Sequence, residues 1–275
     1  MAEEMYRANP TDETIKKYAE GVEQTALFMA DFAKACAPKS GKIKLFGQTA
    51  MQESMSKDFS FNHPFEQVYW HYGLSVAQKW RERQGLERDS EWDEIISRMA
   101  PLAEKDGIYM SGEPSQAFDP KAQSTGFDPF TSAAQSGKKQ ISEEDFALKS
   151  RSDHPAVLGA CGMLPATDQY NKETMKRTTW GWDYGMIAMC AARLGEGDTA
   201  VKALLIDKGK NTYLVSGHNF QEPKRLRLYL PGNGSLLDAV AMMCAGWDGC
   251  GDVLNPGFPK DGRWNVRWEG LQRMQ

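Results

Sequence analysis

The strongest constraint on the fold is the helical spacing of apolar residues in the N-terminal part of the chain. Thr11 suits the position that caps a helix, and after it apolar residues recur every three or four positions up to residue 37. Pro64 opens a second run of this kind that extends to residue 84, and a third run covers residues 89–100. This spacing predicts amphipathic helices, each of which buries one face against a neighbour.

Shorter segments with helical character continue through the rest of the chain. Several of them are rich in small residues, which favour close packing between helices. These shorter predicted helices cover residues 1–8, 156–164, 173–179, 183–194, 198–206 and 235–245. Alternating patterns predict short strands at residues 226–230 and 264–268. We therefore predict a mainly α-helical protein with a few short strands, in which residues 1–275 form one domain.

Residues 112–152 depart from this helical pattern. They are rich in Ser, Gln, Gly, Lys and Asp and contain few apolar side chains. A stretch of this length without helical spacing is predicted to be a long loop or an insertion, and loops of this kind often act as lids.

The composition excludes several classes of protein. Lys and Arg number 33 against 37 Asp and Glu, and the basic residues form no stripe, which argues against nucleic acid as the partner. No apolar run reaches the roughly 18 residues of a membrane span, and residues 1–10 lack the pattern of a signal peptide. The four histidines are dispersed and the five cysteines lack C-x-x-C spacing, so we predict packing thiols, no metal site and no cofactor. The alternative for Cys244 and Cys250 is a disulfide.

Tryptophan, amide and histidine side chains gather between glycines in residues 178–234. Flat apolar rings suit stacking against pyranose rings, and side-chain amides suit hydrogen bonds to sugar hydroxyls. The glycines let the backbone bend tightly where those side chains meet. This stretch predicts a sugar site. The alternative is a set of ordinary turns between helices with a buried tryptophan or two.

Two carboxylates fit the chemistry of glycoside hydrolysis, which needs one group to donate a proton and another to activate water or attack the sugar. Glu53 lies in an irregular stretch close to several aromatic residues, and desolvation there would keep it protonated as an acid. Asp183, between two aromatic residues at a predicted helix start, is the candidate for the second role. The alternative for each residue is a helix-capping carboxylate. Asp153 and Glu113 are weaker candidates.

A series of short motifs follows the chain from residue 52 to residue 234. The motifs are Gln52-Glu53, Phe61-Asn62-His63-Pro64-Phe65-Glu66, Tyr69-Trp70, Ser152-Asp153-His154-Pro155, Thr179-Trp180-Gly181-Trp182-Asp183, Gly217-His218-Asn219 and Leu230-Pro231-Gly232-Asn233-Gly234. In this order they resemble glycoside hydrolase family sixty-five and its uncharacterised relatives in bacterial polysaccharide-degrading systems. The resemblance extends from residue 6 to residue 268.

The resemblance implies an (α/α)6 toroid with a central active site and inverting hydrolysis of an α-linked oligosaccharide or polysaccharide. It maps the general acid onto Glu53, and by position Asp183 becomes the base. It also implies a periplasmic or extracellular location. The sugar-binding residues that we expect from the motifs and the residue types are Gln52, Asn62, Trp70, Asp153, His154, Trp180, Trp182, His218, Asn219 and Asn233.

Two departures from the family pattern leave alternatives open: the chain is short for a full toroid, and the interval 173–180 is short for the family while residues 112–152 are long. A full toroid needs about 300 residues at ordinary helix and loop lengths, so the chain resembles the C-terminal part of the catalytic domain. The phosphate-binding arrangement of phosphorolytic members has no clear match, so hydrolysis is favoured over a glycoside phosphorylase. The alternatives from other classes are a non-catalytic carbohydrate-binding helical protein, an inactive fragment of such an enzyme, and a helical scaffold without a ligand.

Overall fold

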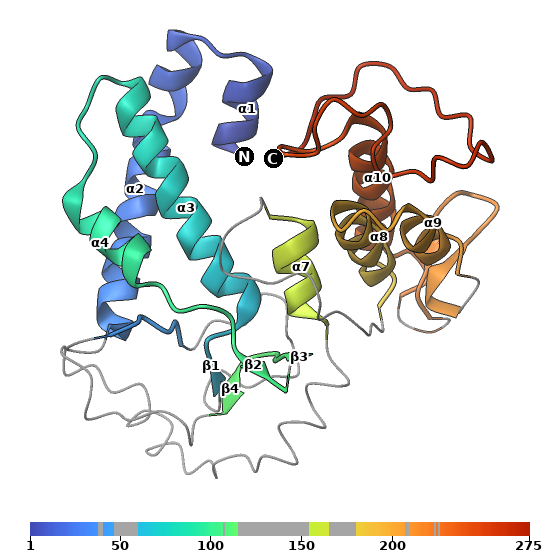
Figure 1. The fold of residues 1–275 in the computed structure, drawn as a ribbon, viewed down its shortest axis with the longest axis horizontal. Coiled ribbons are helices and arrows are strands. Elements are labelled where there is room, and N and C mark those ends of the chain that lie inside the picture. Colours follow the sequence, from blue (N-terminus) through green and yellow to red (C-terminus); the bar gives the residue numbers. More distant parts are fainter. Residues whose placement is uncertain are drawn as a thin grey trace. The chain divides into compact units, whose positions relative to one another are not determined.

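The structure, a computed structural model, describes residues 1–37, 41–46, 60–106, 108–114, 154–164, 180–206, 209–222, 224 and 226–275. Helices dominate these residues and the strands are short (Figure 1). The predicted mainly α-helical class is confirmed, whereas the toroid stays a prediction. The chain divides into two compact units. Unit 1 comprises Met1–Ala50, Met55–Lys105 and Met110–Phe146, and unit 2 comprises Met51–Ser54, Asp106–Tyr109 and Ala147–Gln275.

Unit 1 contains the long amphipathic helices that the sequence predicts. Its helices are α1 (Ala2–Ala8), α2 (Asp12–Cys36), α3 (Pro64–Arg83) and α4 (Ser90–Arg98). The Oγ1 atom of Thr11 accepts a hydrogen bond from Thr14 N at 3.2 Å, and Asp89 caps α4 in the same way. Helices α2 and α3 lie side by side, and α4 packs against both (Figure 1). The local signals therefore place these helix ends correctly.

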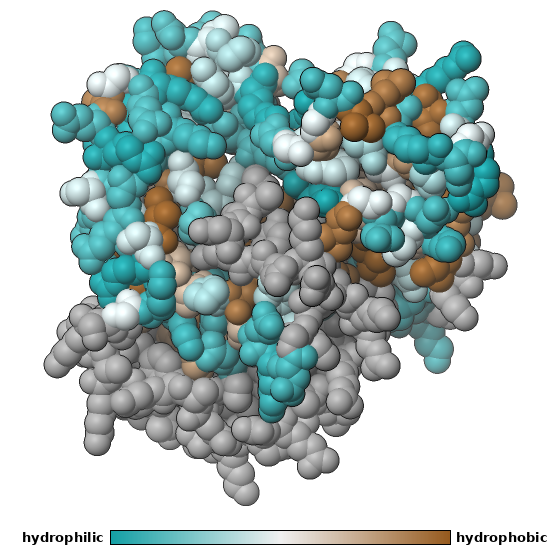
Figure 2. All heavy atoms as spheres, viewed as in Figure 1, coloured by the Kyte–Doolittle hydropathy of each residue, from teal (hydrophilic) through white to brown (hydrophobic). Residues whose placement is uncertain are grey.

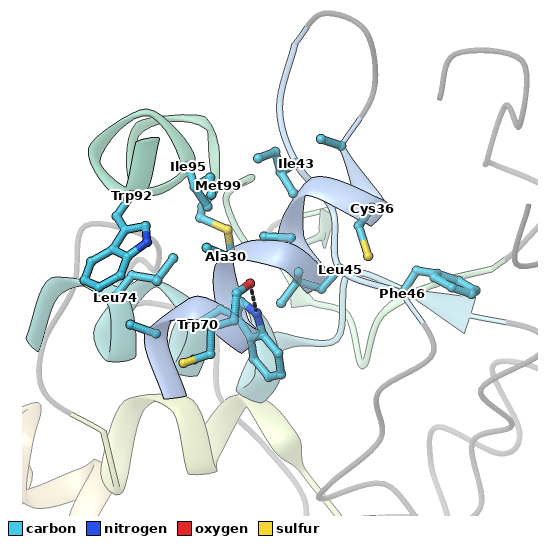
Figure 3. Close-up of a cluster of buried hydrophobic side chains, with 14 of the residues drawn as sticks. Ala30, Cys36, Ile43, Leu45, Phe46, Trp70, Leu74, Trp92, Ile95 and Met99 are labelled. Carbon is cyan, nitrogen blue, oxygen red and sulfur yellow. Dashed lines mark hydrogen bonds between the residues drawn. The ribbon is translucent and has the colours of Figure 1, made fainter. Parts of the chain in front are cut away.

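The core of unit 1 lies where α2, α3 and α4 meet (Figure 3). Trp92 and Leu74 are fully buried there, together with Ile95 from α4 and Met99, the residue that follows this helix. Trp70 also belongs to this core, with 7% of its surface exposed, and its Nε1 donates to the Met29 carbonyl at 2.9 Å. The hydrogen bond satisfies the only polar atom of the Trp70 side chain inside an otherwise apolar cluster.

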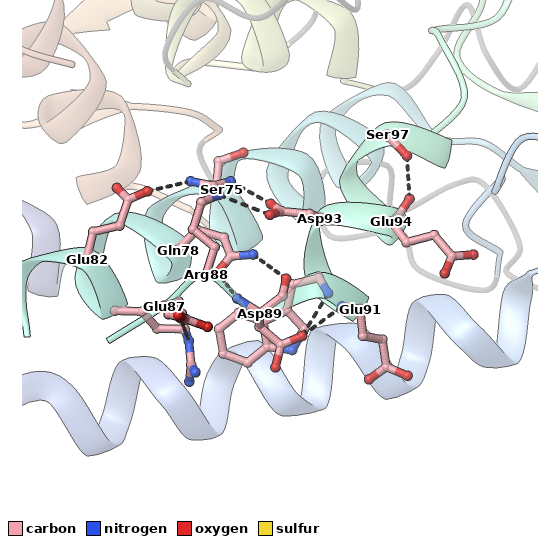
Figure 4. Close-up of polar contacts among 12 residues, drawn as sticks. Ser75, Gln78, Glu82, Glu87, Arg88, Asp89, Glu91, Asp93, Glu94 and Ser97 are labelled. Atoms are coloured by element: carbon pink, nitrogen blue, oxygen red, sulfur yellow. Dashed lines mark hydrogen bonds and ion pairs between the residues drawn. The ribbon is translucent and has the colours of Figure 1, made fainter. Parts of the chain in front are cut away.

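The connection between α3 and α4 is fixed by polar contacts (Figure 4). Gln78 donates from Nε2 to the Asp89 carbonyl at 2.6 Å and accepts from Asp89 N at 2.9 Å. Arg88 bridges Glu82 and Asp93 on the surface, and its hydrogen bonds hold the pKa of Asp93 below the ordinary value. Because these ion pairs are exposed, they add little to stability, and the buried amide of Gln78 fixes the turn.

A buried glutamine holds the irregular segment 41–46 against the helices. Gln67 in α3 donates from Nε2 to the Ile43 carbonyl at 2.8 Å, and its Oε1 accepts from Leu45 N at 3.1 Å. The strands β1 (Ser60–Phe61) and β4 (Glu113–Pro114) pair antiparallel beside this segment. The other short strands are β2 (Glu104–Lys105) and β3 (Ile108–Tyr109). Of the predicted long loop at 112–152, only residues 112–114 are described; the rest of that prediction lies outside the described residues.

A buried carboxylate attaches α1 to α3. The carboxylate of Glu3 accepts hydrogen bonds from Arg83 Nη2 at 2.8 Å and from Trp80 Nε1 at 2.7 Å. The Arg83 guanidinium also lies 4.0 Å from the centroid of the Tyr6 ring. Burial opposes ionisation of Glu3, but the hydrogen bonds from Arg83 and Trp80 outweigh it and lower the pKa of the carboxyl.

We expect Glu3→Gln to weaken the docking of α1 by about 1–3 kcal/mol at neutral pH, the range for a charged hydrogen bond. The lowered pKa means that the ionised carboxylate stabilises the folded state above the unfolded pKa. This contribution is lost as the pH falls through the folded pKa, so the difference between wild type and variant should shrink below about pH 4.5. Urea unfolding, followed by tryptophan fluorescence at several pH values, measures the difference in the free energy of unfolding between wild type and variant. Glu4→Gln, which removes an exposed charge from the same turn, is the matched control.

Unit 2 consists of shorter helices and one hairpin. The helices are α7 (Ala156–Gly162), α8 (Asp183–Arg193), α9 (Gly197–Leu204) and α10 (Leu230–Ala245), with the 3-10 helix η3 (Gly209–Asn211). The strands β5 (Thr212–Tyr213) and β6 (Asn219–Phe220) pair antiparallel. Helix α8 packs against α7, α9 and α10 (Figure 1), so it is the central helix of this unit.

Glycines bring the backbones of α7, α8 and α10 into contact. A Cβ atom on Gly185 of α8 would lie 2.1 Å from Ser235 Oγ and 2.4 Å from Ser235 O in α10. On Gly162 of α7 it would lie 3.0 Å from the Met186 carbonyl in α8. The predicted close packing of small residues is therefore present. None of the five cysteines, all within the described residues, forms a disulfide, which excludes the Cys244–Cys250 alternative.

Three predictions in the C-terminal part are wrong. Helix α10 begins at Leu230, five residues before the predicted start, so residues 230–234, which the sequence pattern does not predict as helical, form its first turn. Residues 226–229 form no strand, because the Leu226 carbonyl instead accepts from Gln221 N and Glu222 N, both at 3.1 Å. Residues 264–268 form no strand either. Asn255 holds this segment, because its Oδ1 accepts from Trp268 Nε1 at 2.8 Å and its Nδ2 donates to the Val266 carbonyl at 3.3 Å.

The surface carries apolar groups among polar ones (Figure 2). In unit 2 the exposed large hydrophobic residues include Leu228, Leu230, Leu237 and Val240 near or on α10. Among the described helices, none is long and apolar enough to cross a membrane.

Candidate functional site

The candidate site begins with the turn that leads into α8. Trp180, Gly181 and Trp182 form this turn, and Asp183 is the first residue of the helix. The Oδ2 atom of Asp183 accepts a hydrogen bond from Trp180 N at 2.6 Å and closes the turn. A negative charge at this position also interacts favourably with the helix dipole. Burial raises the pKa of the neighbouring Tyr184, and the charge of Asp183 raises it further.

Asp183 and His154 form a buried pair. Asp183 Oδ1 lies 2.9 Å from His154 Nδ1, and the two side chains are 0% and 4% exposed. Trp182 Nε1 lies 3.0 Å from the same nitrogen, with its ring edge-on to the imidazole. An indole N–H only donates, whereas an ionised carboxylate only accepts. The same nitrogen of His154 therefore lies next to one group that only donates, the Trp182 N–H, and one carboxylate, that of Asp183.

Aromatic rings lie next to this pair, and the Lys210 side chain lies over one of them. The Trp180 ring is half-buried and lies 5.4 Å from the His154 ring and 6.3 Å from the Tyr229 ring, between centroids. The Lys210 ammonium lies over the Trp180 ring, 4.4 Å from its centroid. Trp182 and Tyr229 are also half-buried. The rings are therefore held in place while part of each remains open to solvent.

Amide side chains support the same turn from the hairpin. Gln221 Oε1 accepts from Gly181 N at 3.0 Å, and Asn219 Nδ2 donates to the Lys210 carbonyl at 3.3 Å. Asn233 Oδ1 accepts from Asn219 N at 2.9 Å, which links the hairpin to α10. A Cβ atom on Gly181 would lie 2.4 Å from Asn219 Oδ1, so only glycine fits there.

Two atoms of these buried amides have no hydrogen-bond partner among the described residues: Asn219 Oδ1 and Gln221 Nε2. Asn219 is 0% exposed and Gln221 is 4% exposed, so water does not satisfy these atoms from the surface. Such groups are uncommon in folded proteins and often mark a place where a ligand or an ordered water binds. They lie against the turn that carries Trp180.

We name His154, Trp180, Trp182, Asp183, Lys210 and Tyr229 the tryptophan wall. Of the predicted sugar-binding residues, it contains His154, Trp180 and Trp182, and Asn219 and Asn233 adjoin it. His218 lies in the β5–β6 turn, with Nδ1 3.1 Å from Ser216 Oγ.

The remaining predicted residues lie elsewhere. Asn62 and Trp70 belong to unit 1, where Asn62 Nδ2 donates to Glu113 Oε1 at 2.7 Å and Trp70 packs in the core. Their positions show structural contacts, and a sugar-binding role for them stays a prediction. The predicted site residues Gln52, Glu53 and Asp153 lie outside the described residues.

Three residues of this region are absent from the predicted set: Lys210, Gln221 and Tyr229. Lys210 is 30 positions from Trp180 and stands in a polar segment with no periodic signal. Gln221 and Tyr229 fall within sequences that resemble a loop and a strand. Only the fold of the hairpin onto the turn before α8 shows that they belong together.

The chain shows no match to models of known protein families and no significant match to curated proteins. Among the described residues, no group of three or more His, Cys, Asp or Glu side chains is placed to share a metal ion.

Proposed function

We propose that this chain is a glycoside hydrolase, or the part of one, that binds an α-linked oligosaccharide against the tryptophan wall. The observation that carries the proposal is the set of half-exposed rings of Trp180, Trp182 and Tyr229 fixed around the buried His154–Asp183 pair. Rings that are held in place before binding lose little entropy when a sugar stacks on them.

The proposed roles follow the contacts of each residue. The rings of Trp180, Trp182 and Tyr229 supply apolar surface for the sugar, and the hairpin amides fix the shape of the wall. Glu53 is the proposed general acid, on the sequence resemblance. In an inverting enzyme the second carboxyl would lie about 6.5–9.5 Å from the first, with a water between sugar and base.

Asp183 has contacts that support a positioning role. One of its oxygens binds His154 and the other binds Trp180 N, and the side chain has no exposed surface. A base must reach the attacking water with a carboxylate oxygen. We therefore propose that Asp183 orients His154 and Trp180, while the base role predicted from its sequence position remains to be tested.

A second candidate function is carbohydrate binding without hydrolysis. The same burial of Asp183 favours it, because a protein that only binds sugar needs the wall but no exposed base. Hydrolysis of any α-linked oligosaccharide by the purified chain would exclude this candidate.

Trp180→Ala is expected to weaken oligosaccharide binding about 10- to 30-fold, as for truncation of an aromatic contact residue. Calorimetric titration with a panel of α-linked oligosaccharides measures the affinity, and NMR of the released anomer measures hydrolysis and its stereochemistry. Trp264→Ala is the matched control, because Trp264 is an exposed tryptophan whose ring packs on Phe258, which is not a residue of the wall. Absence of both binding and cleavage in the wild type would contradict the proposal. Equal loss in both variants would remove the wall as its site.

A further inference from the structure

We infer that the sugar bound at the tryptophan wall carries an acidic group, such as a carboxylate or a sulfate. This inference rests on the proposed function and adds the chemical class of the ligand to it. Two observations carry it: the position of the Lys210 ammonium and the unsatisfied amide of Gln221.

The Lys210 ammonium lies at the wall without a carboxylate partner. It sits 4.4 Å from the centroid of the Trp180 ring, and no ion pair with Asp or Glu of the described residues is formed. The nearby carboxylate of Asp183 is already bonded to His154 and to Trp180 N. The ring holds the cation in place by a cation–π contact but does not neutralise its charge. An anion that binds beside Trp180 would do so.

The Gln221 amide provides a second donor on the same turn. Its Oε1 atom accepts from Gly181 N at 3.0 Å, and its Nε2 has no acceptor in the part of the chain that the structure describes, although the side chain is only 4% exposed. The backbone of Lys210 approaches the same glycine, since a Cβ atom on Gly181 would lie 2.8 Å from the Lys210 carbonyl. Both donors therefore come from segments that pack on the Trp180–Gly181 turn.

An acidic sugar matches these donors better than a neutral one. Hydroxyl groups accept hydrogen bonds, but only an ionised group also compensates the charge of Lys210, and charge-assisted hydrogen bonds are about twice as strong as neutral ones. The loop between β6 and α10 carries the exposed cations Lys224 and Arg227 together with the half-buried Glu222. The described residues beside Trp180 thus include an ammonium and an amide donor, next to the acceptor Asn219 Oδ1.

The experiment compares two α-1,4-linked trisaccharides, trigalacturonic acid and maltotriose, by calorimetric titration at low ionic strength. We expect trigalacturonic acid to bind at least about tenfold more tightly. Lys210→Met keeps the apolar stem and removes the charge, so it should lower the preference for trigalacturonic acid over maltotriose about tenfold. Lys210→Arg is the control that keeps the charge. Thermal unfolding of each variant checks that the fold is retained.

A second variant and a second ligand separate the remaining outcomes. Gln221→Glu keeps the acceptor for Gly181 N but replaces the donor by an oxygen, so it should also weaken trigalacturonic acid more than maltotriose. Sulfated maltotriose distinguishes the two acidic groups, and tighter binding of either acidic sugar than of maltotriose supports the inference. Equal affinity for neutral and acidic sugars, or no effect of Lys210→Met on the acidic ones, would overturn it while the proposed function stands. If no sugar binds at all, the proposed function fails with it.

Discussion

Replacement of Asp183 by alanine is expected to lower the free energy of unfolding of unit 2 by about 1–3 kcal/mol, the cost of removing a buried hydrogen-bond acceptor from its donors. The side chain is fully buried and holds both His154 and the backbone N–H of Trp180. Without it, the His154 ring and the backbone N–H of Trp180 lose their hydrogen bonds to this carboxylate. Hydrogen exchange of the α8 backbone amides in the full chain measures the loss.

The matched control for this prediction is Asp198→Ala. Asp198 stands in the first turn of α9, as Asp183 does in α8, but it is exposed, and among the described residues it pairs with the exposed Arg263. We expect a change below about 1 kcal/mol for an exposed pair. If Asp183→Ala changed the exchange rates no more than Asp198→Ala, the pair with His154 would not stabilise unit 2.

Asp183→Asn tests the role of the carboxylate in catalysis. A positioning role predicts that the variant weakens oligosaccharide binding as the wall loosens, and that hydrolysis falls in parallel. The base role predicts lost hydrolysis with unchanged binding and unchanged exchange of α8. The two roles therefore differ in the binding constant, which titration measures directly.

Glu53→Gln is expected to lower turnover of an α-linked oligosaccharide by about 100- to 10,000-fold and to leave sugar binding intact, as for loss of a general acid. Glutamine has nearly the same shape as glutamic acid but no acidic proton for the leaving oxygen. The expectation rests on the sequence resemblance, because Glu53 lies outside the described residues.

The leaving group provides a sharp test of the acid role of Glu53. A glycosyl fluoride leaves with little help from an acid, so the variant should hydrolyse the fluoride at close to the wild-type rate. Glu87→Gln, in the exposed connection between α3 and α4, is the control. Normal turnover of the oligosaccharide by Glu53→Gln would show that another residue is the acid.

The sequence predicts the long helices well because their signals are local. The cap at Thr11, the proline at position 64 and the cap at Asp89 lie within one residue of the observed helix starts. The start of α10 is missed because Pro231 and two glycines resemble a loop. Position 232 requires glycine because a Cβ atom there would lie 2.4 Å from Asn219 Oδ1. This is a tertiary contact, which the local sequence pattern does not reveal.

The candidate site is only partly predictable for the same reason. Residue type identifies Trp180, Trp182 and Asp183 as candidates, but the pairing of Asp183 with His154 joins positions 29 apart through the fold. Trp70 is predicted to bind sugar but packs in the core of unit 1. The helical spacing of an aromatic residue is the same in a core and on a sugar-binding surface, so the sequence pattern does not distinguish them.

The backbone contact between Gly185 and Ser235 also constrains how the wall can move. Ser235 Oγ donates to the Trp182 carbonyl at 2.6 Å, so the turn before α8 is bonded to α10 as well as to α8. A displacement of Trp182 on ligand binding would therefore have to carry two helices with it. We expect this part of unit 2 to respond as one rigid body, with ligand-induced adjustment confined to side-chain rotamers such as that of Lys210.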